Sequence, residues 1–339
     1  MKHIVETVLS GPRVAGALRS AKRFNESTVF PPPSTGEGSF LMRSVMDLDP
    51  RLGKWISNRA IRVNDPFARR IADVSTSRFV DSGEIDTAVA GIRRDGFYVF
   101  NKVAEPSFVE AIRSFAERVP AQGRGSTAAP APYPRSDPEQ GRYDISEETA
   151  LQSPEVQEFV TDPAMALIAQ RYLGQPVLMD EVAFWWTTSK KAEDANLNAQ
   201  QFHQDRDRRS FLKFFIYLTD VTPRTGPHVY IRGSHRKIPF SLRADGRKTD
   251  EDVKRAGLWD EVQEICGPAG TLMAVDTIGL HKGKTPEVGD RLALENEFAT
   301  SLFGAEYEIP AFTPTDVTKR RYAEMPWVLQ RYASAITSE

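Results

Sequence analysis

From residue 176 onward, apolar and polar positions follow the short period of β-strands. The strand-like segments are rich in β-branched and aromatic residues and are bounded by Gly, Pro, Asp and Thr, as is typical of strands joined by turns. They cover residues 177–188, 211–218, 228–232, 271–275 and 291–300. Several short strands with turn signals between them predict an antiparallel sandwich or barrel.

Nearer the N-terminus the pattern has the period of helices. Residues 86–92 and 106–118 show apolar positions at helical spacing, and residues 96–101 between them predict a strand that follows a turn. At the other end, residues 316–336 predict one surface helix. The pattern as a whole therefore predicts a mainly β domain with flanking helices.

We expect three parts within the 339 residues. They are a helical or irregular N-terminal extension (1–85), a β domain (86–310) and a C-terminal helix (311–339). Inside the domain, residues 120–142 are poor in apolar side chains and contain five prolines, which predicts a long loop. A lid over a binding site and plain disorder remain alternative interpretations of this loop.

Composition and charge exclude several classes of protein. Apolar residues make up 40% and charged residues 27%, so the chain can bury a sizeable core. The net charge of −2 provides no footprint for nucleic acid. A single cysteine, Cys266, forms no intrachain disulfide and no cysteine-rich metal site, so we expect the reducing cytoplasm as the compartment.

The basic N-terminal stretch does not change this picture. Glu6, Ser10, Gly11 and Pro12 interrupt its apolar residues, so we expect no secretory signal there. No apolar run reaches the ~20 residues that a membrane helix needs, so we expect no stable membrane insertion.

Candidate metal ligands stand out among the five histidines. His203 and Asp205 form an H-x-D motif, and on a strand both side chains would point to the same face and reach one ion. The motif alone is weak, because chance produces it often. However, a buried-looking strand (270–275) leads to His281, and Arg291 opens another strand ten residues later.

Two histidines and one carboxylate are the ligand set of non-haem Fe(II) oxygenases. Three positions of the octahedron then stay open for a bidentate 2-oxo acid and O₂. A guanidinium such as that of Arg291 would bind the far carboxylate of the 2-oxo acid.

The joint pattern resembles the Fe(II)/2-oxoglutarate dioxygenases of the phytanoyl-CoA dioxygenase family. Residues 94–99 resemble the opening strand of that family, 211–221 its central strand, and 225–228 and 232–235 the turns that follow. The resemblance covers about residues 86–305. The sequence departs from the family pattern at Arg232, where proline is often found.

The resemblance implies a double-stranded β-helix (a cupin-like jelly roll) that uses Fe(II), 2-oxoglutarate and O₂. It implies that His203, Asp205 and His281 hold the iron and that Arg291 binds the C5 carboxylate of 2-oxoglutarate. Related halogenases lack the carboxylate ligand, so Asp205 favours hydroxylation or another oxidative step.

Lys213 allows two interpretations. It shares a strand face with Phe215, and if that face lines the barrel, the buried cation needs a partner. Glu295 and Glu297, which share a face with Arg291 on the strand 291–300, could form an internal ion pair with Lys213; alternatively, Lys213 contacts 2-oxoglutarate or an acidic group of the substrate. Phe215 would form a wall of the co-substrate pocket in either case.

The remaining candidates are less specific. Trp185 and the tryptophan after it face opposite sides of their strand, and we expect Trp185 to line the cavity and contact substrate. Arg142 and Tyr143, at the end of the predicted loop, could also reach a substrate, or form a solvated pair. His228 and His235 lie at turns, where we expect structural roles.

These residues predict an Fe(II)/2-oxoglutarate-dependent oxygenase that hydroxylates an unactivated C–H bond of a small molecule such as a secondary metabolite. Succinate and CO₂ would be released. The alternatives are a non-catalytic jelly-roll binding protein and a cupin metalloenzyme that does not use 2-oxoglutarate. Arg291 argues against both, because a co-substrate carboxylate is what needs it. The N-terminal extension could mediate a homodimer.

Overall fold

The computed structural model describes residues 70–74, 77–190, 199–206, 208, 210–244, 246–303 and 308–338, together with residues 19 and 21–23. Most of the predicted extension (1–85) therefore lies outside the described residues. Within the described part of the chain, no helix has the length and apolar character needed to cross a bilayer.

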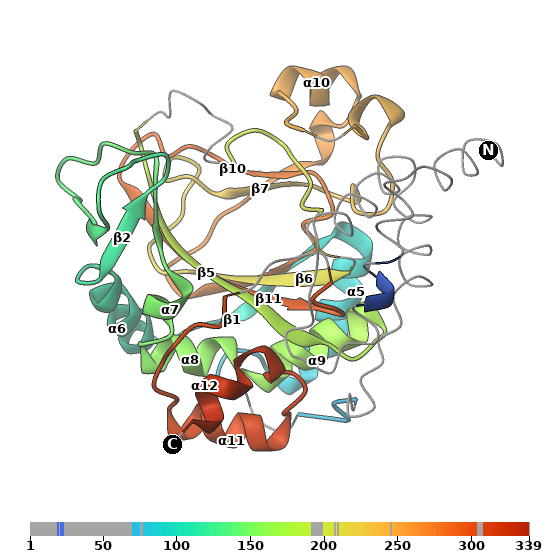
Figure 1. Cartoon of the computed structure of the whole chain (residues 1–339). Helices are drawn as coiled ribbons and strands as arrows, with labels where there is room; N and C mark the ends of the chain where they lie inside the picture. Colours follow the sequence, from blue (N-terminus) through green and yellow to red (C-terminus); the bar gives the residue numbers. More distant parts are fainter. Residues whose placement is uncertain are drawn as a thin grey trace.

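Two antiparallel sheets form the body of the protein (Figure 1). The large sheet has eight strands in the order β1-β9-β6-β11-β5-β4-β2-β3, and the small sheet has three in the order β10-β7-β8. The strands are β1 Phe97–Val103, β2 Pro120–Gly123, β3 Ala131–Pro132, β4 Arg142–Ile145, β5 Leu178–Thr188, β6 Phe211–Tyr217, β7 His228–Ile231, β8 Val262–Ile265, β9 Thr271–Val275, β10 His281–Gly283 and β11 Asp290–Ala299. This arrangement is the predicted jelly roll, with a large sheet that does not close on itself.

Most helices cover the outer face of the large sheet, below it in Figure 1, whereas α10 (Asp250–Arg255) lies on the opposite side and packs against the small sheet. The helices are α5 Ile85–Asp95, α6 Pro106–Ala116, α7 Glu147–Ala150, α8 Pro154–Val160, α9 Pro163–Leu173, α10 Asp250–Arg255, α11 Asp316–Glu324 and α12 Ala333–Thr337, with 3₁₀ turns η1 Ser82–Glu84, η2 Phe240–Leu242, η3 Trp259–Glu261 and η4 Gln330–Tyr332. Two of them, α8 and α9, begin at a side-chain cap followed by proline, which lacks the N–H that a first helical turn leaves unbonded.

The register of the large sheet decides which side chains reach the interior. On β6, Phe214 and Ile216 belong to the apolar core shared with the helices, whereas Phe215 and Tyr217 belong to an apolar cluster shared with the small sheet. Lys213 has the same parity as Phe215 and so points inward. A slip of one residue would move this lysine into the helix-covered core, so burial on both faces fixes the register.

The predicted loop over 120–142 is irregular for most of its length, but short strands that the sequence did not predict interrupt it. Strands β2, β3 and β4 extend the large sheet there, with β4 paired to β5. Pro120 and Pro132 face each other across β2 and β3, at the edge of the sheet, where a missing backbone N–H breaks no ladder. The prolines that suggested a structureless segment are therefore compatible with an edge.

The predicted single surface helix at the C-terminus is also wrong. Helix α11 ends at Glu324, and α12 begins only at Ala333. Pro326 lies between them, and a proline cannot continue a helix because it lacks the N–H and clashes with the preceding turn. Leu329 and Tyr332 in this interval are buried, so the tail belongs to the core.

Asp162 gives the stability of this core a pH dependence that can be tested. It caps α9, accepting from Ala164 N at 2.9 Å and from the Ser77 hydroxyl, yet burial raises the pKa of its carboxyl to about 6. A carboxyl whose pKa is raised on folding contributes stability below its unfolded pKa, and that contribution is lost as pH rises through about 6.

We therefore expect Asp162→Asn, which keeps a capping oxygen, to raise the free energy of unfolding by roughly 1–3 kcal/mol near pH 8 but not near pH 4. Urea unfolding at both pH values measures this difference. The control is Asp252→Asn in the exposed capping box of α10, where hydrogen bonds from Thr249 lower the pKa of the carboxyl, so no gain is expected. An Asp162→Asn protein no more stable than wild type near pH 8 would contradict the argument.

Candidate metal centre

Three of the predicted ligands converge in the structure. The Nε2 and carboxylate oxygen donors of His203, Asp205 and His281 lie within 4.8 Å of one another. The backbone explains how residues so far apart meet. His203 and His281 form an antiparallel bridge with N–H···O distances of 2.9 and 3.0 Å, and Asp205 N donates to Thr277 O at 2.9 Å.

Both imidazoles present the nitrogen that a metal needs. Nδ1 of His203 lies 2.9 Å from Gln201 O, and Nδ1 of His281 lies 3.0 Å from Gly279 O. A carbonyl oxygen only accepts, so each Nδ1 carries the proton and each Nε2 keeps its lone pair free. Burial, followed by the repulsion that a protonated His281 would exert, lowers the pKa of His203 to about 3. Burial also lowers the pKa of His281, so both rings are neutral.

Asp205 is held in its ionised form. Burial would raise the pKa of its carboxyl, but the charge of Lys213 and the nearby imidazoles outweigh burial and hold the pKa below its usual range. Its oxygens lie 3.7 Å from His203 Nε2 and 3.6 Å from His281 Nε2, too far for hydrogen bonds. Three donors thus converge without satisfying one another, and this donor set fits a divalent iron.

Arg291 is a buried cation without an acidic partner among the residues that the structure describes. Its side chain donates to Gly226 O and, at 3.1 Å, to the Thr187 hydroxyl, while its Nε has no partner. Burial lowers the pKa of the guanidinium. A buried charge of this kind is costly unless an anion pairs with it, so the site fits a carboxylate.

Lys213 lies between four carboxylates rather than facing open space. Its Nζ is 2.8 Å from Glu295, 3.3 Å from Glu297 and 3.3 Å from Asp205. These opposite charges outweigh burial and raise the pKa of the lysine. Glu181, on β5, has a carboxylate oxygen within 4.8 Å of those of Glu295 and Glu297. Of the two interpretations, the structure places Lys213 in the ion pair and next to a metal ligand.

The inner face of the large sheet forms a wall beside these groups. Trp185 and Phe215 meet there with ring centroids 6.3 Å apart. The Arg142 guanidinium lies 4.2 Å from the centre of the Trp185 ring and bonds Asp144 at 2.6 Å. The structure does not bring Tyr143 to this wall, because successive residues of β4 face opposite sides. Its ring packs against Tyr133 on the outer side.

The described part of the chain matches the family model for phytanoyl-CoA dioxygenase (PhyH) over residues 92–285, more than half of the sequence. The chain belongs to the phytanoyl-CoA dioxygenase family. It is therefore an enzyme of the iron- and 2-oxoglutarate-dependent oxygenase type, and both cofactors of that type fit the residues described above. A search of curated proteins finds no match.

Solved structures with a similar fold are distant in sequence. AviO1 from Streptomyces viridochromogenes is 17% identical, with 67% of this chain and 96% of that one covered and a TM-score of 0.42. HygX from Streptomyces hygroscopicus, with nickel, 2-oxoglutarate and hygromycin B bound, is 16% identical, with 68% and 93% covered and a TM-score of 0.47. The epimerase SnoN, in complex with Fe³⁺, α-ketoglutarate and nogalamycin RO, is 19% identical, with 65% and 84% covered and a TM-score of 0.46.

In this phytanoyl-CoA dioxygenase family member, His228 lies next to the candidate metal ligands. The sequence did not indicate this position. Its ring lies parallel to that of His281, with centroids 5.4 Å apart and 8° between planes. The centroids of the His228 and Phe215 rings lie 5.2 Å apart. Burial lowers the pKa of His228 well below its usual range. The pairing of β7 with β10 brings the two histidines together, and a turn motif alone does not reveal that pairing. His235, by contrast, contacts Arg93 O on the outside.

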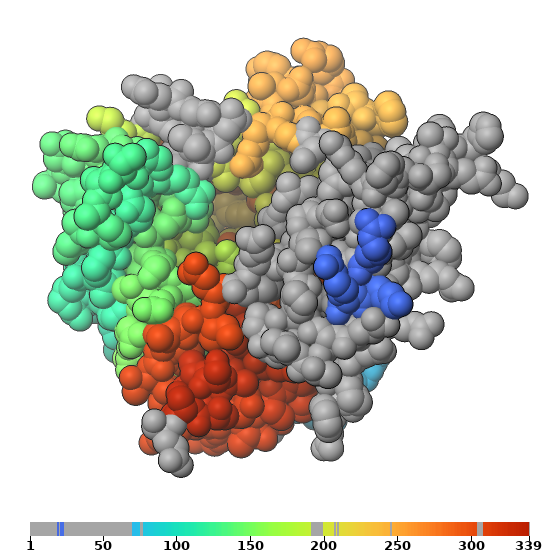
Figure 2. Space-filling model, in the orientation of Figure 1, coloured from blue at the N-terminus to red at the C-terminus, as the bar shows by residue number. Residues whose placement is uncertain are grey.

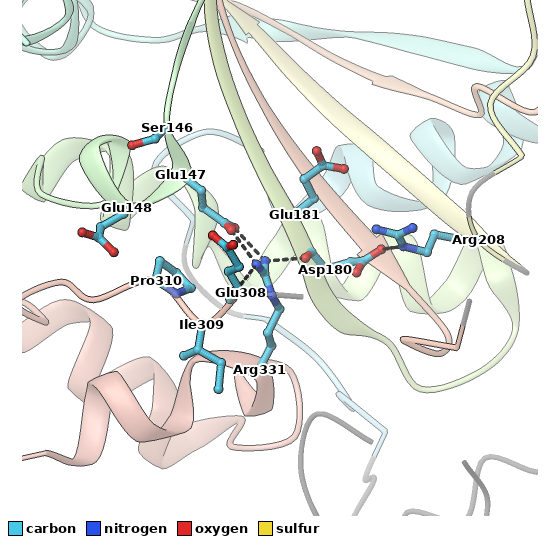
Figure 3. Close-up of a pocket in the computed structure, with 10 residues that line it drawn as sticks. All are labelled: Ser146, Glu147, Glu148, Asp180, Glu181, Arg208, Glu308, Ile309, Pro310 and Arg331. Carbon is cyan, nitrogen blue, oxygen red and sulfur yellow. Dashed lines mark hydrogen bonds and ion pairs between the residues drawn. The ribbon is translucent and has the colours of Figure 1, made fainter. Parts of the chain in front are cut away.

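A polar hollow of about 370 Å³ opens at the start of β5 (Figure 3). Arg331 crosses it and donates to the Glu147 carboxylate and to the carbonyls of Asp180 and Glu308. Glu181 lines the same hollow and points away from Arg331. Because Glu181 also lies beside the carboxylates around Lys213, the hollow borders the acidic side of the candidate metal centre.

A hollow is also seen on the face shown in Figure 2. It lies between the green segment near residues 120–150 and the orange segment that carries α10.

Proposed function

We propose that this protein hydroxylates an unactivated C–H bond of a small molecule, using Fe(II), 2-oxoglutarate and O₂. The observation that carries the proposal is the convergence of the three candidate metal donors in a chain that also buries Arg291, a cation without a carboxylate partner among the described residues. A structural metal site would need the triad but would have no use for Arg291.

His203, Asp205 and His281 would hold the metal, and the carboxylate side chain of Asp205 supports hydroxylation. When bound, the iron with 2-oxoglutarate and O₂ supplies the oxidation of the C–H bond, with release of succinate and CO₂. Lys213 keeps Asp205 ionised through its contact at 3.3 Å. Each carbonyl that accepts from an Nδ1 fixes the orientation of its imidazole ring.

The apolar wall excludes water and orients the organic molecules. Phe215, 6% exposed, would lie against 2-oxoglutarate, and Trp185 with Arg142 would contact the substrate. A flat aromatic surface with a guanidinium above it suits a ligand that combines apolar and polar parts.

Anaerobic titration of Fe(II) and then 2-oxoglutarate into the purified protein tests the proposal. We expect a weak visible charge-transfer band that appears with both ligands and is absent from His281→Ala. Oxygen should then release succinate. Iron binding without a band on adding 2-oxoglutarate would instead support a cupin enzyme of another kind, and no iron binding would support a binding protein.

Arg291 should set the affinity for 2-oxoglutarate. Arg291→Gln removes the positive charge while keeping a polar side chain, so we expect the dissociation constant for 2-oxoglutarate to rise roughly 10–100-fold. The anaerobic titration measures it directly. Arg224→Gln is the matched control, because Arg224 is exposed and pairs with Glu287 on the surface. Equal affinities in wild type and Arg291→Gln would remove Arg291 from the co-substrate site.

A further inference from the structure

His228 carries a buried polar atom that the arrangement described so far leaves unused. Its Nε2 is shielded from solvent and has no hydrogen-bond partner among the described residues. Its ring fills space between His281 and Phe215, which a phenylalanine would do equally well. Buried polar atoms cost free energy unless something bonds them, so packing alone does not explain a histidine here.

The backbone brings this ring against His281 on one side and keeps it within two residues of a backbone contact to Arg291. On the small sheet, Tyr230 pairs with His281 and His228 pairs with Gly283, so both histidines point inward. Gly226, two residues before His228, accepts a hydrogen bond from Arg291. A Cβ built on Gly283 would lie 3.5 Å from Arg291 Nη2, so the guanidinium lies beside the backbone residue that pairs with His228.

Arg291 likewise has a buried hydrogen-bond donor without an acceptor in the described part of the chain. Its Nε is also buried and without a partner. A neutral imidazole carries one N–H, which can reside on Nε2. Two buried donors, one on each sheet, therefore both lack an acceptor, and a single carboxylate between the sheets would satisfy both.

We propose that His228 binds the co-substrate, donating a hydrogen bond from Nε2 to the carboxylate of 2-oxoglutarate that Arg291 also binds. This inference rests on the proposed function. It gives His228 a role in co-substrate affinity in place of the structural role expected from its position at a turn.

The test compares two variants, each of which keeps one of the two properties of His228, its ring or its hydrogen-bond donor. His228→Phe keeps a flat ring against His281 but has no donor, and His228→Gln keeps an N–H donor without the ring. We expect His228→Phe to raise the dissociation constant for 2-oxoglutarate roughly 10–100-fold and His228→Gln to recover much of the loss. Anaerobic titration of the Fe(II)-loaded proteins, followed by the charge-transfer band, measures these constants without turnover.

A double variant tests whether the two residues share one carboxylate. If they do, Arg291→Gln with His228→Phe should lose less affinity than the product of the two single losses. Affinity for Fe(II) should stay at the wild-type value in His228→Phe, because His228 is not among the three converging ligands.

Several results would overturn the proposal. Unchanged 2-oxoglutarate affinity in His228→Phe, a His228→Gln variant as weak as His228→Phe, or a double variant equal to the product would each do so. A loss of Fe(II) affinity would show that the ring only supports His281. In these cases wild-type binding of 2-oxoglutarate would still stand, whereas a wild-type protein that does not bind it would refute the proposed function together with this inference.

Discussion

Replacement of His203 by alanine is expected to abolish 2-oxoglutarate-dependent succinate formation. His203 supplies one of the three donors that converge among the described residues, and its ring is fixed by the Gln201 carbonyl and by the bridge to His281. Loss of an outer-shell partner alone reduces metal affinity or activity by 10–100-fold, so loss of the ligand should exceed about 100-fold. Succinate release at saturating Fe(II) and bound iron per chain measure the effect.

The matched control for this variant is His235→Ala. His235 is a histidine outside the converging donors, in contact with Arg93 O, so its removal should leave iron binding intact. Thermal unfolding of both variants separates loss of ligand from loss of fold. Full succinate release by His203→Ala, with iron still bound, would show that the metal lies elsewhere.

The convergence of the candidate metal ligands was predictable because their geometry is local or follows from an antiparallel pairing. His203 and Asp205 are close in sequence. The strand-like segment before His281 predicts a third ligand that can lie beside them. The detail differs from the expectation, since His203 lies in an isolated bridge and Asp205 follows it outside any strand. The bonds from His203 to His281 and from Asp205 to Thr277 replace a regular ladder and still aim both side chains at one point.

Register across strands was not predictable in the same way. Arg142 and Tyr143 looked equally able to reach a substrate, yet the pairing of Arg142 with Thr187 puts only the arginine on the inner face. The closeness of His228 to His281 likewise depends on how β7 pairs with β10. Side chains alternate with a period of two, so pairing decides each of these positions, and a single sequence does not give it.

Proline content misled the prediction at two places for opposite reasons. Pro120 and Pro132 favour a loop in the sequence, but they lie at an edge of the sheet where a missing N–H is harmless. Pro326 was overlooked inside a predicted helix, where a missing N–H breaks the structure. The missing N–H of proline is harmless at a sheet edge, where no strand needs it, and disruptive inside a helix, where the preceding turn does.

Lys213→Met is expected to destabilise the protein strongly. The lysine is 13% exposed and is the partner of Glu295 and Glu297, each of which has a side chain less than 10% exposed. Removing one member of a buried ion pair typically costs about 3–5 kcal/mol, because the remaining charge is left without compensation. Urea unfolding in the presence of a chelator measures the change in the free energy of unfolding without a contribution from metal binding.

The control is Lys254→Met, which removes an exposed lysine paired with Glu251 and should cost no more than about 1 kcal/mol.

The pH dependence of the stability gives a second criterion. Burial raises the pKa of Glu295 and Glu297, and Lys213 opposes that rise, so both pKa values should climb further in Lys213→Met. Groups with raised folded pKa values lose their stabilising contribution as pH increases. The deficit of Lys213→Met relative to wild type should therefore shrink from about pH 8 to pH 5. A deficit that stays constant over this range would mean that lost packing of the lysine stem, rather than uncompensated charge, destabilises the variant.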